Sequence, residues 1–372
     1  MKRARGSSRA VVAALPLAGL LWASGCSQVP QRRLDAADPT LYGLCADPAA
    51  REAWERANLA LAKGDDAGAL PDLIACVKAC PDFVRGHVTY QDCARRLGGE
   101  VERAMVTTYL STPERPSPVP AYLKARLADT PYAQCNALEA LLKRDPSFAW
   151  AHLSRGRVTR LQGRLLPALD MLAAAAVNDP ELHEAKLERA QVLAELGRDA
   201  EAATQYRAYL QARTDDLVAV KEFVTLLLYR FGRVEEASPW IDRLERAMPG
   251  SVSVRMDRAA AFWSAGRHRE AIDIYLSVLQ AAPSTSRAAL NIGLLYYEVV
   301  PQDDAARRRF WPRARLAFEW FLATATAAEG HEQFERTLGV PFRLARIAEL
   351  LGPASAPRGD SQDARALSWP DS

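Results

Sequence analysis

The feature that most constrains the fold of this 372-residue chain is a glycine that recurs at a nearly constant interval. Each such glycine follows a stretch with the amphipathic pattern of a helix, and the six are Gly64, Gly98, Gly163, Gly197, Gly232 and Gly266. The intervals between them are 34, 65, 34, 35 and 34 residues, so the long interval spans two units, one of which lacks its glycine. A period of this size indicates a repeat protein, in which each unit packs against its neighbours in the chain.

Other positions of the unit have their own physical roles. The glycine lets the backbone turn between two helices without the steric penalty of a Cβ atom. An alanine about five residues later allows close helix packing, a bulky residue one turn further on fills the groove, and a proline ends the unit. The clearest unit, 252–285, has these features at Ala259, Phe262, Gly266, Ala271, Tyr275 and Pro283.

A helix–turn–helix unit of 34 residues with these positions resembles the tetratricopeptide repeat family. The resemblance covers residues 48–351 and implies an all-α fold: a right-handed α-solenoid of about eight units with a C-terminal capping helix. The units are expected near 50–83, 84–114, 115–148, 149–182, 183–217, 218–251, 252–285 and 286–328, and the cap at 332–351.

Three parts of the chain depart from the regular pattern. The unit 115–148 is crowded with prolines in its first helix, and an insertion at 301–313 delays the second helix of the eighth unit to 314–325. Residues 352–372 are rich in Pro, Ser, Ala and Asp, so we expect them to be disordered.

The N-terminal residues have the pattern of an export signal. Four basic residues precede an apolar stretch at 10–23, and Cys26 follows small residues. The pattern resembles a bacterial lipoprotein signal peptide over 1–25, which implies lipid attachment at Cys26 and a lipidated tether over 26–47. Ser27 after the cysteine implies the outer membrane, facing the periplasm. An ordinary signal peptide cut nearby is the alternative, whereas a spanning helix would need about 20 apolar residues.

Charge and motifs exclude several classes of function. The net charge is +3, and the signal holds four basic residues and no acidic ones, so the mature chain carries −1. This balance does not favour nucleic-acid binding. The sequence has no G-x-S-x-G elbow, phosphate-binding loop or dinucleotide-binding glycine motif. We therefore expect no enzyme activity, cofactor or metal.

Five cysteines of the mature chain besides Cys26 lie in its first third: Cys45, Cys76, Cys80, Cys93 and Cys135. Because the two helices of a unit are antiparallel, Cys45 and Cys80 should lie at the same end, and they are the first choice for a disulfide. Cys76 could reach Cys93, which leaves Cys135 unpaired. The alternatives are buried free thiols, or a zinc site formed by Cys76, Cys80, His87 and Cys93.

The resemblance implies that the second, fifth, ninth, twelfth and thirteenth positions of each unit face the concave groove. The residues there include Trp54, Asn58, Trp150, Arg157, Arg160, Gln191, Tyr229, Arg230, Met256, Trp263, Arg287 and Tyr297. Aromatic residues and arginines dominate binding hot spots. We expect the groove to hold a peptide or helix of another envelope protein. The basic and aromatic run 307–313 is a second candidate contact, for an anionic head group or an acidic partner, unless it is a solvated helix extension.

Three functional hypotheses follow. The first is a non-catalytic protein–protein interaction scaffold anchored to the bacterial cell envelope by its N-terminal lipid. A narrower alternative is a pilotin-like assembly factor for an outer-membrane secretion or pilus complex. The third, suggested by the clustered cysteines, is a periplasmic thiol or redox accessory protein.

Overall fold

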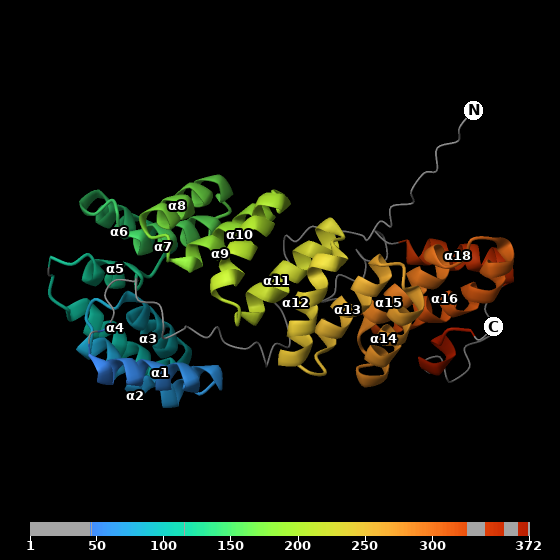
Figure 1. The fold of residues 1–372 in the computed structure, drawn as a ribbon, viewed down its shortest axis with the longest axis horizontal. Helices are drawn as coiled ribbons and strands as arrows, with labels where there is room; N and C mark the ends of the chain where they lie inside the picture. Colours follow the sequence, from blue (N-terminus) through green and yellow to red (C-terminus); the bar gives the residue numbers. More distant parts are fainter. Residues whose placement is uncertain (1–44, 46, 115, 326–338, 353–363, 371–372) are drawn as a thin grey trace. The chain divides into compact units, whose positions relative to one another are not determined.

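The computed structural model describes residues 45, 47–114, 116–325, 339–352 and 364–370 of the chain. The predicted signal peptide, Cys26 and nearly all of the predicted tether lie outside these residues. Every regular element in the described part is a helix, and consecutive helices pack as hairpins (Figure 1). The fold is therefore all-α and built from successive helix pairs, as the period predicts.

The chain divides into two compact units, here called the N-terminal unit (described residues up to 222) and the C-terminal unit (described residues from 223). Five hairpins make up the N-terminal unit, each with a first and a second helix. The helices are α1 (Pro48–Ala62), α2 (Asp66–Ala79), α3 (Val84–Leu97), α4 (Gly99–Ser111), α5 (Val119–Ala125), α6 (Pro131–Arg144), α7 (Ala149–Leu161), α8 (Leu165–Asn178), α9 (His183–Glu195) and α10 (Asp199–Ala212).

The boundary between the units falls inside α11 (Leu217–Thr225). The helices that follow are the π-helical turn η1 (Leu226–Phe231), α12 (Val234–Ala247), α13 (Val252–Ser264), α14 (His268–Ala281), α15 (Ser286–Leu294), the π-helical turn η2 (Leu295–Val299), α16 (Asp304–Thr324), α18 (Val340–Leu351) and the 3₁₀ turn η4 (Ala364–Leu367).

Small residues allow the two helices of a hairpin to approach each other. Between α7 and α8, Gly163 adopts a φ of 75°, a left-handed conformation that only glycine takes without strain. Within α7, a Cβ atom added to Gly156 would lie 2.7 Å from Cγ of Leu172 on α8. Ala168 and Leu172 are both completely buried at this contact. The glycine and alanine positions of the repeat thus set the helix spacing.

The single interval of 35 residues has a structural counterpart. It separates Gly197 from Gly232, and the helix that ends just before Gly232 closes with the π-helical turn η1. A π-helical turn accommodates one more residue than an α-helical turn. The additional residue is therefore absorbed inside the first helix, and the hairpin keeps its register.

The proline-rich third hairpin has a shortened first helix. α5 contains seven residues, whereas α7 contains thirteen. Prolines precede it at 113, 116 and 118, and proline has no N–H group to continue a helix. The short helix still contributes to the core, because Tyr122 is fully buried and packs edge-on against Phe148 with ring centroids 5.4 Å apart.

The insertion in the eighth hairpin is helical, which corrects the expected start of its second helix at 314. α16 begins at Asp304 and runs for 21 residues. Asp303 caps it, because its carboxylate accepts a hydrogen bond from the Ala306 N–H at 2.7 Å. Phe310 and Trp311 are buried, so the aromatic part of the run 307–313 belongs to the core.

The last elements also differ in part from the prediction. α18 lies within the expected cap and packs against α16, whereas residues 332–338 of that cap lie outside the described residues. The prediction of disorder for 352–372 does not fit residues 364–370. They form η4 and pack against α14 and α16, because Leu367 and Trp369 supply apolar side chains to the core. Among the described residues, no helix combines the length and apolar character needed to cross a membrane.

Candidate protein-interaction surface

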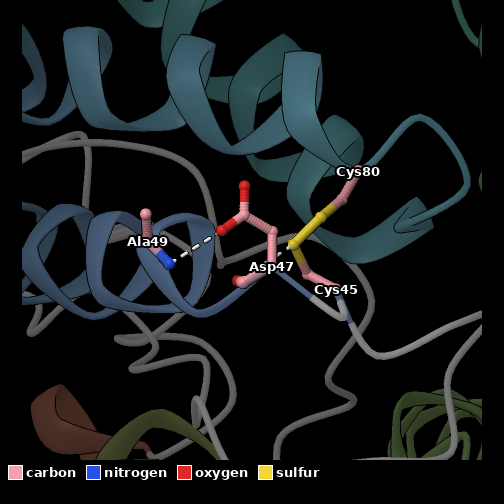
Figure 2. The surroundings of a disulfide bond; sticks show 4 residues. All are labelled: Cys45, Asp47, Ala49 and Cys80. Carbon is pink, nitrogen blue, oxygen red and sulfur yellow. Dashed lines mark hydrogen bonds between the residues drawn. A yellow bond between two sulfur atoms is a disulfide. The ribbon is translucent and has the colours of Figure 1, made fainter.

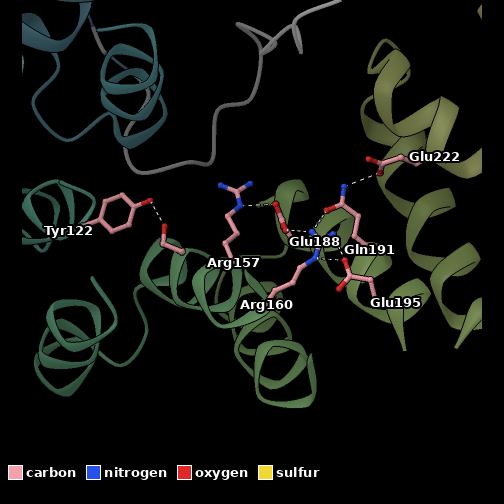
Figure 3. A network of polar contacts seen from close by, with 8 residues as sticks. Tyr122, Arg157, Arg160, Glu188, Gln191, Glu195 and Glu222 are labelled. Carbon is pink, nitrogen blue, oxygen red and sulfur yellow. Dashed lines mark hydrogen bonds and ion pairs between the residues drawn. The ribbon is translucent and has the colours of Figure 1, made fainter. Parts of the chain in front are cut away.

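Three of the predicted groove residues meet in a polar network on the first helices of the N-terminal unit (Figure 3). From α7, Arg157 Nε donates to Glu188 Oε1 at 2.7 Å, and Arg160 Nη2 donates to Glu195 Oε1 at 2.6 Å. Arg160 also pairs with Glu188 at 3.2 Å and donates to the amide oxygen of Gln191. Arg157 and Arg160 are thus held by side chains of α9.

The network continues to the next first helix. Gln191 Nε2 on α9 donates to Glu222 Oε2 on α11 at 2.9 Å, and the Tyr206 hydroxyl donates to the same oxygen at 3.1 Å. The sequence placed Arg157, Arg160 and Gln191 on one face, and the structure brings them together. Their partners are residues of this chain, so a ligand would have to break these contacts in order to use them.

A buried ion pair near this network was not predicted. Arg85 Nη2 on α3 lies 2.9 Å from Glu184 Oε1 on α9, and their side chains are 3% and 12% exposed. Burial alone would raise the pKa of Glu184, but the positive charges of Arg85, Arg213 and Arg157 outweigh it and hold the pKa below its ordinary value. Arg85 and Glu184 both occupy the second position of their units. The opposite charges at this shared position were the sequence signal that could have indicated the ion pair.

Two of the predicted groove residues lie in the core instead. Trp54 is 3% exposed and packs edge-on against Phe83, with ring centroids 5.1 Å apart. Trp150 is 2% exposed and packs against Tyr122. These rings fill the space between neighbouring hairpins, and we therefore do not retain them as binding residues. Asn58, on α1, is half-buried.

In the C-terminal unit, three successive first helices contribute polar residues to one place. These residues are Tyr229 in η1, Asp257 on α13 and Arg287 on α15. The Tyr229 hydroxyl donates to Asp257 Oδ1 at 3.4 Å. Burial raises the pKa of Tyr229, and the Asp257 charge adds to this, whereas the positive charge of Arg287 opposes it. Arg287 therefore lies close enough for its charge to act on the phenol.

Arg287 differs from the arginines of the N-terminal network. Arg287 is exposed, and it forms no ion pair with any carboxylate among the described residues. Arg157 and Arg160, by contrast, are paired with glutamates of the next first helix. Arg287 thus presents an exposed guanidinium that is available to a partner.

The remaining predicted groove residues are partly covered. Met256 and Trp263, on α13, are half-buried against the C-terminal core. Arg230 lies in η1 next to Tyr229 and is half-exposed. Tyr297 stacks on Trp311 with ring centroids 4.9 Å apart, and the guanidinium of Arg343 lies 5.8 Å from its ring. The first helices of the C-terminal unit therefore carry partly exposed aromatic and sulfur-containing side chains in addition to Arg287.

The cysteines separate into two groups. Cys45 and Cys80 form a disulfide with a Cα–Cα distance of 5.3 Å, next to the Asp47 that caps α1 (Figure 2). Cys76 and Cys93 are free and fully buried, so the second expected bridge is not formed. The alternative zinc site also fails, because the sulfur of Cys80 is bonded to Cys45. Burial raises the pKa of both free thiols to about 11.

A cavity of about 600 Å³ lies beside the shortened helix α5. Its walls include Val77 on α2, His87 on α3, Tyr109 on α4 and Leu123 on α5. His87 Nδ1 and the Tyr109 hydroxyl share a hydrogen bond of 2.7 Å.

Comparisons with known proteins agree with the hairpin pattern. A tetratricopeptide repeat family model matches residues 162–216 and 256–298. The chain therefore contains tetratricopeptide repeats in both units. No curated protein matches the sequence.

Three solved structures are similar to this chain at low sequence identity. YrrB, a tetratricopeptide repeat protein with an unusual peptide-binding site, is 15% identical over 54% of this chain and 98% of its own, with a TM-score of 0.43. PilW, a type IV pilus biogenesis factor, is 18% identical over 56% and 98%, with a TM-score of 0.37. A tetratricopeptide repeat protein from Parabacteroides merdae is 15% identical over 65% and 96%, with a TM-score of 0.36.

Proposed function

We propose that this protein is a non-catalytic interaction scaffold that binds an acidic segment of a partner protein at the first-helix face of its C-terminal unit. We use this name for the surface around Tyr229, Met256, Trp263 and Arg287. The observation that carries the proposal is the contrast between arginines. Arg157 and Arg160 of the N-terminal unit are paired with glutamates of the same chain, whereas Arg287 is exposed without a carboxylate partner among the described residues.

The chemistry of the face fits such a ligand. A guanidinium can hold a carboxylate through two parallel hydrogen bonds, which gives direction as well as affinity. Tyr and Trp beside it supply contact area with little loss of side-chain entropy. Because Tyr229 is held by Asp257, part of the face is ordered before a partner binds.

We also propose that the scaffold is exported and held at the envelope by a lipid on Cys26. The Cys45–Cys80 disulfide supports export, since such bonds persist in oxidising compartments. The pattern around Cys26 supports the lipid, and a short chain segment would then connect the membrane to α1. A pilotin-like role remains the narrower form of this proposal.

Substitution of the available arginine tests the binding proposal. Arg287→Glu reverses the charge that would meet the partner, whereas Arg269→Glu makes the same change on the exposed surface of a second helix, α14. Partners retained by each purified variant from detergent-solubilised envelopes would be compared by mass spectrometry. We expect at least one partner bound by the wild type and by Arg269→Glu to be lost only in Arg287→Glu. Identical partner sets for all three folded proteins would contradict the proposal.

A further inference from the structure

Residues 364–370 lie on the C-terminal unit in the manner of a bound peptide. Three of their backbone carbonyl oxygens accept hydrogen bonds from side chains of η2 and α16. These bonds run from the Tyr296 hydroxyl to Leu367 at 2.9 Å, from Arg313 Nε to Ser368 at 2.7 Å, and from Arg309 Nη2 to Pro370 at 3.2 Å. Side-chain donors thus hold three carbonyls within four consecutive residues.

Two side chains of the same segment act as apolar anchors. Leu367 is 1% exposed and belongs to the C-terminal core. Trp369 packs against Phe310 and Tyr296, with ring centroids 5.3 Å and 6.1 Å away. Backbone hydrogen bonds combined with pockets for alternate side chains are the means by which proteins recognise extended peptides.

The receiving surface comes from the part of α16 that regular repeats lack. Arg309, Phe310 and Arg313 all lie in the segment by which α16 extends beyond its expected start at 314. Part of the basic and aromatic run therefore has a structural role: Arg309 and Arg313 donate to backbone carbonyls, and Phe310 packs against Trp369. We call the surface formed by Tyr296, Arg309, Phe310 and Arg313 the strap site.

We propose that the strap site is a peptide-binding site that the chain fills with its own residues 364–370, and that a partner segment with leucine and tryptophan two positions apart competes for it. The occupant is joined to α18 by residues 353–363, so its binding is intramolecular. Its effective concentration at the site is on the order of millimolar. A partner with equal contacts must overcome this advantage, which makes the site autoinhibited. The inference does not depend on the first-helix face.

The first experiment weakens the internal occupant and supplies it from outside. In the full-length mature chain, Leu367→Ala and Trp369→Ala together remove both anchors. A fluorescent peptide of residues 363–370 is then titrated into this double variant and into the wild type, and binding is followed by anisotropy. We expect saturable binding to the double variant and binding about tenfold or more weaker to the wild type, whose site is occupied.

Receptor variants connect the binding to the strap site. Added to the double variant, Arg313→Ala should weaken peptide binding several-fold because a carbonyl loses its donor. Arg308→Ala is the matched control: Arg308 is an exposed arginine on the same helix and forms no hydrogen bond or ion pair with the described residues 364–370. A folded double variant that does not bind the peptide would overturn the proposal, as would equal binding by both chains or equal effects of the two arginine substitutions.

A second experiment covers the case in which the double variant does not fold. A protease site is placed between residues 353 and 363, and the chain is cut after it has folded. We expect the released segment to dissociate on dilution to nanomolar concentration and to exchange with the labelled peptide. A segment that stays bound through gel filtration and does not exchange would show that it is an integral part of the core.

Discussion

Arginines on the first helices of different hairpins differ here in what surrounds them. Arg157 and Arg160 each meet a glutamate of the next first helix, Arg85 meets Glu184 from a distant hairpin, and Arg287 meets no carboxylate of the described chain. A paired arginine organises the fold, whereas an unpaired one can bind a partner. The assignment of function therefore depends on neighbours that lie far apart in the sequence.

The buried pair Arg85–Glu184 should make stability depend on acid pH. The pKa of Glu184 is lower in the folded chain than its unfolded value of about 4.3. The stabilisation is therefore complete above the unfolded pKa and is lost as pH falls through the lower, folded pKa. We expect Glu184→Gln to unfold at lower urea concentration than wild type near pH 6.

The difference between the two proteins should then shrink as the pH falls below about 4.3 and through the lower, folded pKa of Glu184. Glu201→Gln is the control, because Glu201 pairs with Arg198 on the exposed surface, where ion pairs contribute little. A urea-midpoint difference between Glu184→Gln and wild type that stays constant from about pH 6 to about pH 3 would show that this pair does not titrate as described.

The two buried thiols should be slow to react. Burial raises the pKa of Cys76 and Cys93 to about 11, so only about one thiol in a thousand is ionised near pH 8. We expect iodoacetamide to modify half-exposed Cys135 first and the other two only after denaturation, as measured by intact mass. Rapid native modification of Cys76 or Cys93 would favour the redox hypothesis over the scaffold.

Among the helices, the close contact between α7 and α8 depends on Gly156, which lies within a helix and not in a turn. In α7, the Cβ of a Gly156→Ala variant would lie 2.7 Å from Leu172 Cγ. Overpacking of this kind typically costs about 1–3 kcal/mol in the free energy of unfolding. Because the clash is with Leu172, the same substitution in a Leu172→Ala background should cost less.

A double-mutant cycle measured by urea unfolding checks this contact. We expect the changes in the free energy of unfolding caused by Gly156→Ala and Leu172→Ala to be strongly non-additive. If the two substitutions added independently, the close approach of α7 and α8 would not be the source of the cost.

The helical hairpins could be predicted because their signals are local. Glycine, alanine and proline act on the backbone and on the adjacent helix, and the additional residue before Gly232 appears as a π-helical turn. Side-chain partners could not be predicted in this way, because the period gives the face of a helix but not what lies opposite. Trp54 and Trp150 illustrate this: their positions suggested a groove, and the neighbouring hairpins bury them.

The contacts of residues 364–370 with the core were not predicted, because residues 352–372 are polar on average. Disorder was expected from the average over the segment, whereas Leu367 and Trp369 act as individual anchors. The start of α16 was also missed, because residues 301–313 were read as an insertion that delays the helix to 314. Proline can be accommodated within the long helix, and Phe310 and Trp311 hold this part of α16 on the core.

At the scale of the whole molecule, the proposed anchor determines where the scaffold can act. Cys26→Ser removes the thiol that would accept the lipid. We expect the variant to move from the membrane fraction to the soluble fraction when the proteins are expressed in a bacterial host. Cys135→Ser is the control, because it also removes a free thiol but leaves the proposed lipid site intact. An equal membrane fraction for both variants would contradict lipid anchoring at Cys26.

The central claim is that a partner binds the first-helix face of the C-terminal unit. Photo-crosslinking in intact cells tests it most directly, with a photoreactive amino acid at Met256 on α13 or at Gln280 on the exposed surface of α14. We expect a discrete crosslinked partner from position 256 that is lost when Arg287→Glu is added and is absent from position 280. The same partner captured equally from both positions, or captured from 256 regardless of Arg287, would contradict it.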